Sequence, residues 1–276
     1  MTNETQTENT DAVDVESTGP ARVISVVAPK GGVGKTTVAS NIAIALAQVA
    51  PNDVVLIDAD VQFGDVATVL NLEPRNNLAT VVTSALNNVT AIKTLLTPHE
   101  SGLFIVPGPA TPMEAENVSG GQLAHLVNVL SREFKFVVLD TTPGLGEHAL
   151  ALLDVSTDVV LVTGLSVADL RSLRKELEVM DEIGLGAMHR HVLLNFFDHD
   201  SGLTKGDAER IAGAPMDFVL PRNKAVHLAN NMGTPAVLDS SNPAAKVLIE
   251  LASRFVDAEI SIAKPKKPLF SRKAKS

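Results

Sequence analysis

The apolar residues of this chain fall into short uncharged runs, separated by longer segments in which apolar residues recur at helical spacing. Aliphatic runs without polar alternation are typical of strands that are buried on both faces of a parallel sheet. We therefore predict strands at residues 23–28, 54–57, 103–106, 136–139, 158–163 and 192–195.

Between these strands, apolar residues spaced for one face of a helix indicate amphipathic helices. We expect helices at residues 37–50, 77–86, 91–96, 121–132, 166–183 and 243–262. Strands that alternate with helices favour the α/β class. The sequence thus predicts a doubly wound, mostly parallel sheet with helices on both faces and a ligand site at the carboxyl ends of the strands.

The composition agrees with one α/β domain, since 45% of the 276 residues are hydrophobic and 20% are charged. We expect an acidic, disordered leader at 1–20, a folded domain at 21–263 and a basic, flexible tail at 264–276. The sequence has no cysteine. That excludes disulfides, thiolate metal sites and iron–sulfur clusters, and it fits a reducing cytosol.

The charge and the hydropathy of the sequence limit the kinds of partner, such as DNA or a membrane, that we expect for this protein. The formal net charge is −9, although the tail carries six basic residues and no acid. An acidic body argues against broad electrostatic binding of DNA. The sequence has neither a signal-peptide pattern nor an apolar run of about 18 residues, so we expect a cytoplasmic protein. Pro265 and Pro268 prevent a continuous helix in the tail, which leaves a solvated segment, weak peripheral membrane contact or DNA contact open.

The strand at 23–28 leads directly into a glycine-rich segment that ends in Lys-Thr-Thr. Its three glycines let backbone N–H groups converge on phosphate oxygens, and the helix that follows directs its positive end at the same anion. Lys35 is placed to bind the β- and γ-phosphates, and the Thr36 hydroxyl to bind Mg²⁺. The predicted nucleotide-binding residues of this loop are Gly31, Gly32, Val33, Gly34, Lys35, Thr36 and Thr37.

The loop sequence KGGVGKTT resembles the deviant Walker A loop of the MinD/ParA family of P-loop ATPases. Pro29 stands where the general pattern has glycine, and Lys30 precedes the double glycine. In that family the extra lysine reaches across a two-fold interface to the partner's ATP, in the manner of an arginine finger. The resemblance implies ATP and Mg²⁺ as ligands, an ATP-dependent homodimer, and catalytic roles for Lys30 and Lys35.

Aspartates follow two of the predicted strands, at the edge where α/β sheets bind ligands. Asp140 after the strand at 136–139 is a Walker B pattern and a predicted Mg²⁺ ligand. By resemblance, Asp58 lies near the metal, and Asp60 is the catalytic residue that positions the attacking water. The alternative for Asp60 is a turn residue that caps the next helix. Gly144 matches the family's glycine near the γ-phosphate.

The resemblance also covers the base site. Asn195 matches the asparagine by which the family reads adenine, and its amide offers the donor and acceptor that N6 and N7 of adenine require. Phe196 replaces the arginine that usually follows. The segment that begins at Asp217 resembles the family's order of strand, proline and helix, which implies one more strand and one more helix there, and Pro221 matches a proline that borders the adenine.

Residues 60–74, with the sequence DVQFGDVATVLNLEP, resemble the CpaE/TadZ branch of the family, which serves pilus assembly. This implies a weak ATPase that localises or assembles a Tad-type pilus or secretion machine. Its partner would be a secretion ATPase or a polar scaffold protein, met at a cell pole or the inner membrane face. Three alternatives remain: a ParA-like partition ATPase for DNA or cargo, a MinD-like regulator of division-site or flagellar placement, and a module that binds ATP without turning it over.

Overall fold

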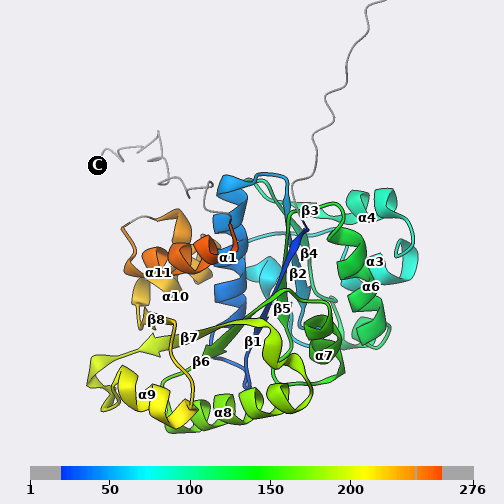
Figure 1. The fold of residues 1–276 in the computed structure, drawn as a ribbon. Coiled ribbons are helices and arrows are strands. Elements are labelled where there is room, and N and C mark those ends of the chain that lie inside the picture. The colour runs from blue at the N-terminus through cyan, green and yellow to red at the C-terminus, as the bar shows by residue number, and fades with distance from the viewer. Residues whose placement is uncertain (1–19, 240, 257–276) are drawn as a thin grey trace, which may run out of the picture.

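The computed structural model describes residues 20–239 and 241–256, and within these ranges eight strands form one sheet in the order β3-β4-β2-β5-β1-β6-β7-β8 (Figure 1). The strands are β1 (Arg22–Val27), β2 (Val54–Ala59), β3 (Thr97–Pro98), β4 (Leu103–Val106), β5 (Phe136–Thr141), β6 (Asp158–Thr163), β7 (His189–Phe197) and β8 (Phe218–Pro221). The predicted basic tail and all but Pro20 of the predicted acidic leader lie outside the described residues.

The sheet is mostly parallel. β1 lies near its centre and pairs in parallel with β5 on one side and β6 on the other. The short edge strand β3 is antiparallel to β4. The doubly wound sheet expected from the alternation of strands and helices is therefore confirmed.

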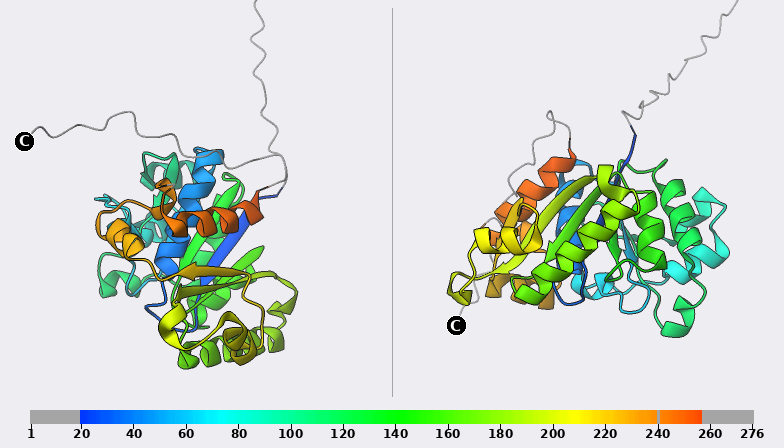
Figure 2. Two further views of the ribbon diagram at one scale, coloured as in Figure 1. Left: turned by 90° about the vertical axis from the view of Figure 1, so that its left-hand side faces the viewer. Right: turned by 60° about the horizontal axis from the view of Figure 1, so that its bottom comes forward.

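Helices cover both faces of the sheet, as Figure 2 shows for α1 and α11 on one side and α8 on the other. The strand residues alternate accordingly: Ile24 and Val26 pack with α1 and α11, whereas Val27 on the opposite face packs with α8 and α9. The helices are α1 (Lys35–Val49), α2 (Val66–Val69), α3 (Leu78–Ser84), α4 (Val89–Leu95), α5 (Pro112–Ala115), α6 (Gly120–Leu130), α7 (Glu147–Asp154), α8 (Val167–Glu182), α9 (Lys205–Ala212), α10 (Lys224–Asn231) and α11 (Pro243–Ala252).

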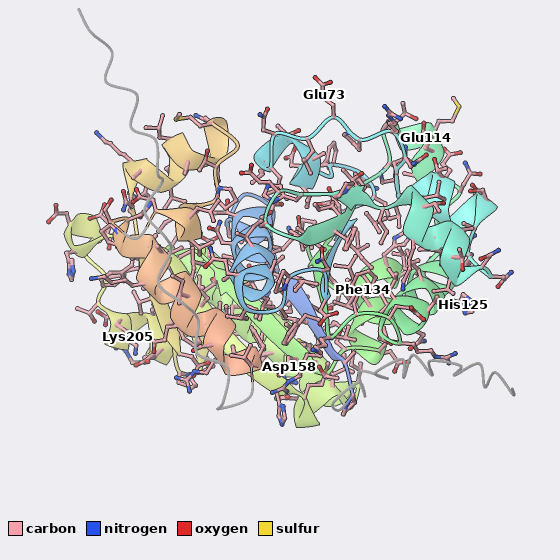
Figure 3. All side chains as sticks on the ribbon, turned by 90° about the horizontal axis from the view of Figure 1, so that it is seen from above. Glu73, Glu114, His125, Phe134, Asp158 and Lys205 are labelled. Carbon is pink, nitrogen blue, oxygen red and sulfur yellow. The ribbon has the colours of Figure 1, made fainter. Side chains whose placement is uncertain are left out.

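The two ends of the parallel strands have different roles. At the amino ends, the buried carboxylate of Asp158 accepts a hydrogen bond from Arg22 at 3.2 Å (Figure 3). This ion pair joins the starts of β6 and β1. At the carboxyl ends, β1 leads into α1 and meets the loops that follow β2, β5 and β7. The candidate site lies at the carboxyl ends of the strands.

One helix boundary differs clearly from the prediction. The last helix was expected at 243–262, but α11 ends at Ala252 and a short 3₁₀ turn follows at Ser253–Phe255; residues 257–262 of this prediction lie outside the described residues. The turn after it brings Phe255 into the core, where its ring packs edge to face on His191 at a centroid distance of 5.5 Å. Burial of Phe255 draws the chain toward the sheet and ends the helix. In residues 20–239 and 241–256, no helix has the length and hydropathy to cross a bilayer.

Candidate functional site

The loop between β1 and α1 has the backbone that its glycines predict. Gly32 and Gly34 have positive φ angles of 79° and 97°, in the left-handed region that favours glycine. Gly34 is also the N-cap of α1. A Cβ atom there would lie 2.4 Å from Nδ2 of Asn195, so glycine is required on both counts. The loop therefore presents the amino end of a 15-residue helix to the site.

A cavity of about 370 Å³ opens beside this loop. Nine of the predicted site residues line it: Gly31, Gly32, Gly34, Lys35, Thr36, Thr37, Asp60, Asn195 and Pro221. The other predicted residues, Lys30, Val33, Asp58, Asp140 and Gly144, are not in its wall. The structure thus brings the loop, the turn after β2 and the ends of β7 and β8 to one cavity.

Two buried carboxylates lie near the carboxyl ends of β2 and β5. Asp58 and Asp140 are opposite each other in the register of β2 and β5, and both side chains are almost inaccessible to solvent. Oδ1 of Asp58 accepts a bond from the N–H of Asp60, and Oδ2 one from the N–H of Val66. Neither carboxylate oxygen of Asp140 has a hydrogen-bond partner within the described residues.

Burial raises the pKa of both carboxyls. For Asp58, desolvation is the larger cause and repulsion by Asp140 the next, and the pKa lies well above its usual range. For Asp140, desolvation raises the pKa to about 7, although the hydroxyl of Thr36 and the ammonium of Lys35 oppose the shift. Without a cation the pair therefore holds a proton near neutral pH.

These residues fit a bound Mg²⁺. Asp140 has two buried oxygens without hydrogen-bond partners in the described residues, and a bound cation would supply the positive charge that balances this carboxylate. In the part of the chain that the structure describes, no three His, Cys, Asp or Glu residues gather in a metal-binding arrangement. A cation here would therefore share its coordination among one or two carboxylates, the Thr36 hydroxyl, phosphate oxygens and water, which is the usual environment of Mg²⁺.

Asp60 combines a turn contact with a place in the cavity wall. Its Oδ1 accepts a bond from the N–H of Phe63 at 3.2 Å, so the side chain does hold the turn after β2. It does not cap the next helix, since the N-cap of α2 is Asp65. Because Asp60 also lines the cavity, it retains an oxygen for a substrate or a water molecule.

Lys30 lies outside the cavity wall. Its ammonium group is 3.6 Å from Oδ1 of Asp169 in α8, and its side chain is 42% exposed. An exposed ion pair of this kind contributes about 1 kcal/mol at most. Lys30 can therefore exchange Asp169 for another anion at little cost.

Gly144 and Asn195 already make hydrogen bonds. The N–H of Gly144 donates to the carbonyl of Ala28 at 2.8 Å, and it could meet a γ-phosphate only if that bond broke. Asn195 donates from Nδ2 to the carbonyl of Val33 and accepts from the N–H of Phe196. It thus joins β7 to the phosphate loop. One N–H and one lone pair of its amide remain for a base, so adenine recognition by Asn195 stays a prediction.

Several cavity residues were not predicted from the sequence. Phe196, Asn223, Val226, His227 and Asn230 come from the end of β7 and from α10, and Phe63 from the turn after β2. The segment after the strand that begins at Asp217 indicated a helix, but its pattern did not say which side chains would face the loop. Phe196 carried the clearer signal, since an apolar ring replaced an expected cation beside Asn195.

Comparison with known proteins places these features in a family. Residues 21–184 match the protein family described as AAA domain. The septum site-determining protein MinD of Escherichia coli strain K12 is 27% identical over 87% of this chain and 92% of its own length.

Two solved structures share the fold. The ParA family ATPase from Chlorobium tepidum has a TM-score of 0.77 at 21% identity and covers 84% of this chain and 98% of its own. The MinD protein from Pyrococcus horikoshii, solved with Mg-ADP, has a TM-score of 0.72 at 21% identity, with coverage of 85% and 95%.

Proposed function

This chain belongs to the AAA domain family of P-loop ATPases of the MinD/ParA type, and from that premise we propose that it is an ATP-dependent dimerising switch. One observation carries the proposal. The glycine-rich loop and Asp60 line one cavity, Asp58 and Asp140 form a buried carboxylate pair on the adjacent strands β2 and β5, and Lys30 lies outside the cavity, held only by an exposed ion pair.

The residues of the candidate site have separate tasks in hydrolysis. The loop N–H groups and Lys35 bind the phosphates, and Asp58, Asp140 and Thr36 would hold Mg²⁺, which would supply positive charge against the phosphates. Asp60 orients a water molecule toward the γ-phosphorus. The water oxygen bonds to phosphorus, the bond from phosphorus to the β–γ bridging oxygen breaks, and the water proton passes late to Asp60 or phosphate. The products are ADP and inorganic phosphate.

Lys30 links the nucleotide to assembly. In a face-to-face dimer, its ammonium leaves Asp169 and binds the phosphates of the partner's ATP, where a cation from a second subunit stabilises the charge of the transition state. ATP can shift the equilibrium toward the dimer only by binding the dimer better than the monomer. The contact of Lys30 with the partner's ATP supplies that difference.

The output that we propose is the placement or assembly of a Tad-type pilus or secretion machine. The support is the resemblance of residues 60–74 to the CpaE/TadZ branch, and a secretion ATPase or polar scaffold protein is the expected partner. The similarity to a septum site-determining MinD favours division-site or flagellar placement as the second candidate. Partition of DNA or cargo is the third, from the similarity to a ParA family ATPase.

Recovery of binding partners from cells tests which cellular role the switch has. An Asp60→Ala bait, expected to stay in the ATP-bound dimer, is recovered from native cells and compared by mass spectrometry with a Lys35→Ala control that lacks the phosphate contact. Enrichment of pilus-base or secretion-ATPase proteins on the first bait supports the pilus role. Enrichment of division proteins or of a centromere-binding protein instead would move the switch to those tasks. A module that binds ATP without turnover is indicated if Asp60→Ala leaves phosphate release unchanged.

A further inference from the structure

A second groove, of about 560 Å³, lies beside the candidate site. The turn after β2 lines it with Val61 and Phe63, and the rest of its wall comes from α5 with its C-cap Glu116 and from the starts of α6 and α7, at Ser119 and Glu147. Phe63 also lines the cavity of the candidate site. The turn after β2 therefore lies between the groove and that cavity.

Two large apolar side chains are exposed to solvent beside this groove. Phe63 is 78% exposed and Met113 of α5 is 77% exposed, the highest values among the large hydrophobic residues that the structure describes. Met113 follows Pro112, which lines the groove. Single exposed apolar residues are common on protein surfaces, but two beside one groove form a patch that is typical of an interaction site.

The segments that form the groove are acidic. Residues 60–65, 107–120 and 141–151 carry five acidic residues and no lysine or arginine. Two of the acids, Glu116 and Glu147, line the groove itself, and both are exposed. Carboxylates in these positions repel phosphate groups, which makes nucleic acids and anionic lipid headgroups unsuitable ligands. They attract the side chains of lysine and arginine.

The groove is joined to the residues that we assign to hydrolysis. The N–H of Phe63 donates to Oδ1 of Asp60 at 3.2 Å. On the other side, Oε1 of Glu147 accepts a bond from the N–H of Gly120 at 3.2 Å, which connects the start of α7 to the start of α6. A ligand that packs on Phe63 therefore acts on the turn that holds Asp60.

From these observations we propose that the groove binds a segment of a partner protein in which an apolar side chain lies between lysine or arginine residues. The apolar side chain packs against Phe63 and Met113, and the flanking cations pair with Glu116 and Glu147. Burial of the exposed ring supplies affinity, and the acidic wall supplies the preference for basic sequences. The proposal goes beyond the proposed function, because neither ATP hydrolysis nor the contact of Lys30 uses this groove.

The test selects peptides from a phage-displayed library of random sequences on the full chain and measures the enriched peptides by fluorescence anisotropy. These peptides should carry lysine or arginine on both sides of an aliphatic or aromatic residue. Phe63→Ser should weaken their binding about 10-fold or more. Glu116→Lys should also weaken it, by a factor that shrinks as the salt concentration rises. Both replaced side chains are exposed, so neither change should disturb the fold.

Two variants outside the groove are the matched controls. Met232→Ser removes an apolar side chain that is 65% exposed at the end of α10, and Glu182→Lys makes the same change of charge at an exposed position of α8. Both should bind the enriched peptides as the wild type does.

The docking site is refuted if the library yields no binder, if the enriched peptides lack basic residues, or if Phe63→Ser binds them as tightly as the wild type. Titration of Mg-ATP into the same protein separates this proposal from the proposed function. A wild type that binds Mg-ATP but no such peptide would leave the ATPase standing and overturn the docking site. A wild type that binds the peptides but not Mg-ATP would overturn the proposed function alone.

Discussion

At the scale of single residues, Asp58 and Asp140 oppose each other on adjacent strands, and two buried carboxylates repel each other unless a proton or a cation compensates them. The raised pKa of Asp140, about 7, means that the folded protein without nucleotide binds more protons than the unfolded chain between about pH 4 and 7. Stability from this group is complete below about pH 4 and is lost as the pH rises through 7.

The pH dependence can be measured. Urea unfolding of the nucleotide-free protein should show a lower free energy of unfolding at pH 8 than at pH 5.5, with on the order of 2 kcal/mol from this group. Asp140→Asn should flatten the slope, and Asp154→Asn, an exposed change at the end of α7, should not. Equal slopes for Asp140→Asn and the wild type would contradict this assignment.

From the sequence, only those roles that short motifs encode locally could be predicted. The loop glycines, Lys35 and Asp140 follow from short motifs next to a buried strand, and a motif needs no knowledge of distant segments. Phe196 and His227 were missed because their meeting depends on a bulge in β7 and on the placement of α10. The ion pair of Lys30 with Asp169 was missed for the same reason, since 139 residues separate the two in the chain.

At the scale of elements, α8 shows where the predicted pattern was incomplete. Leu170, Leu173 and Met180 form a buried apolar stripe on this helix, and Leu177 is partly buried against the same core. Glu176 is buried beside it, with no partner for either carboxylate oxygen within the described residues. Desolvation raises its pKa to about 7, and Lys35 only partly opposes the shift.

Replacement of Glu176 should therefore stabilise the protein. Above pH 7 the folded state must bury an ionised, unpaired carboxylate, so Glu176→Leu should raise the free energy of unfolding at pH 8 by about 2 kcal/mol. The gain should shrink at pH 5, where the carboxyl is protonated in the fold. Glu182→Gln, an exposed change on the same helix, serves as the control. Destabilisation by Glu176→Leu at pH 8 would show that the carboxylate has a structural role.

The sequence predicted the bounds of the strands better than those of the helices. Most predicted strands agree with the structure to within two residues, because an uncharged apolar run marks a strand buried on both faces. α7 and α9 were not predicted, since each has only eight residues and a short apolar face. α11 was predicted too long because apolar periodicity continues past Ala252, whereas burial of Phe255 ends the helix.

At the scale of the whole molecule, the sheet explains why distant segments form one site. The carboxyl ends of β1, β2, β5, β7 and β8 meet at one edge, so residues from Gly31 to Asn230 reach the same cavity. The alternation of strands and helices was enough to predict this arrangement. The alternation did not predict whether two subunits form a dimer, because dimer formation depends on contacts between two copies of the chain.

The most direct test of the switch is light scattering of the full chain with Mg-ATP and with Mg-ADP. The wild type should have a mass near 29.0 kDa with ADP and twice that value with ATP. Lys30→Ala should remain a monomer with Mg-ATP while it still binds the nucleotide, and Lys175→Ala, an exposed lysine of α8, should dimerise normally. If Lys30→Ala dimerises with Mg-ATP as the wild type does, the proposed link between ATP and assembly is wrong.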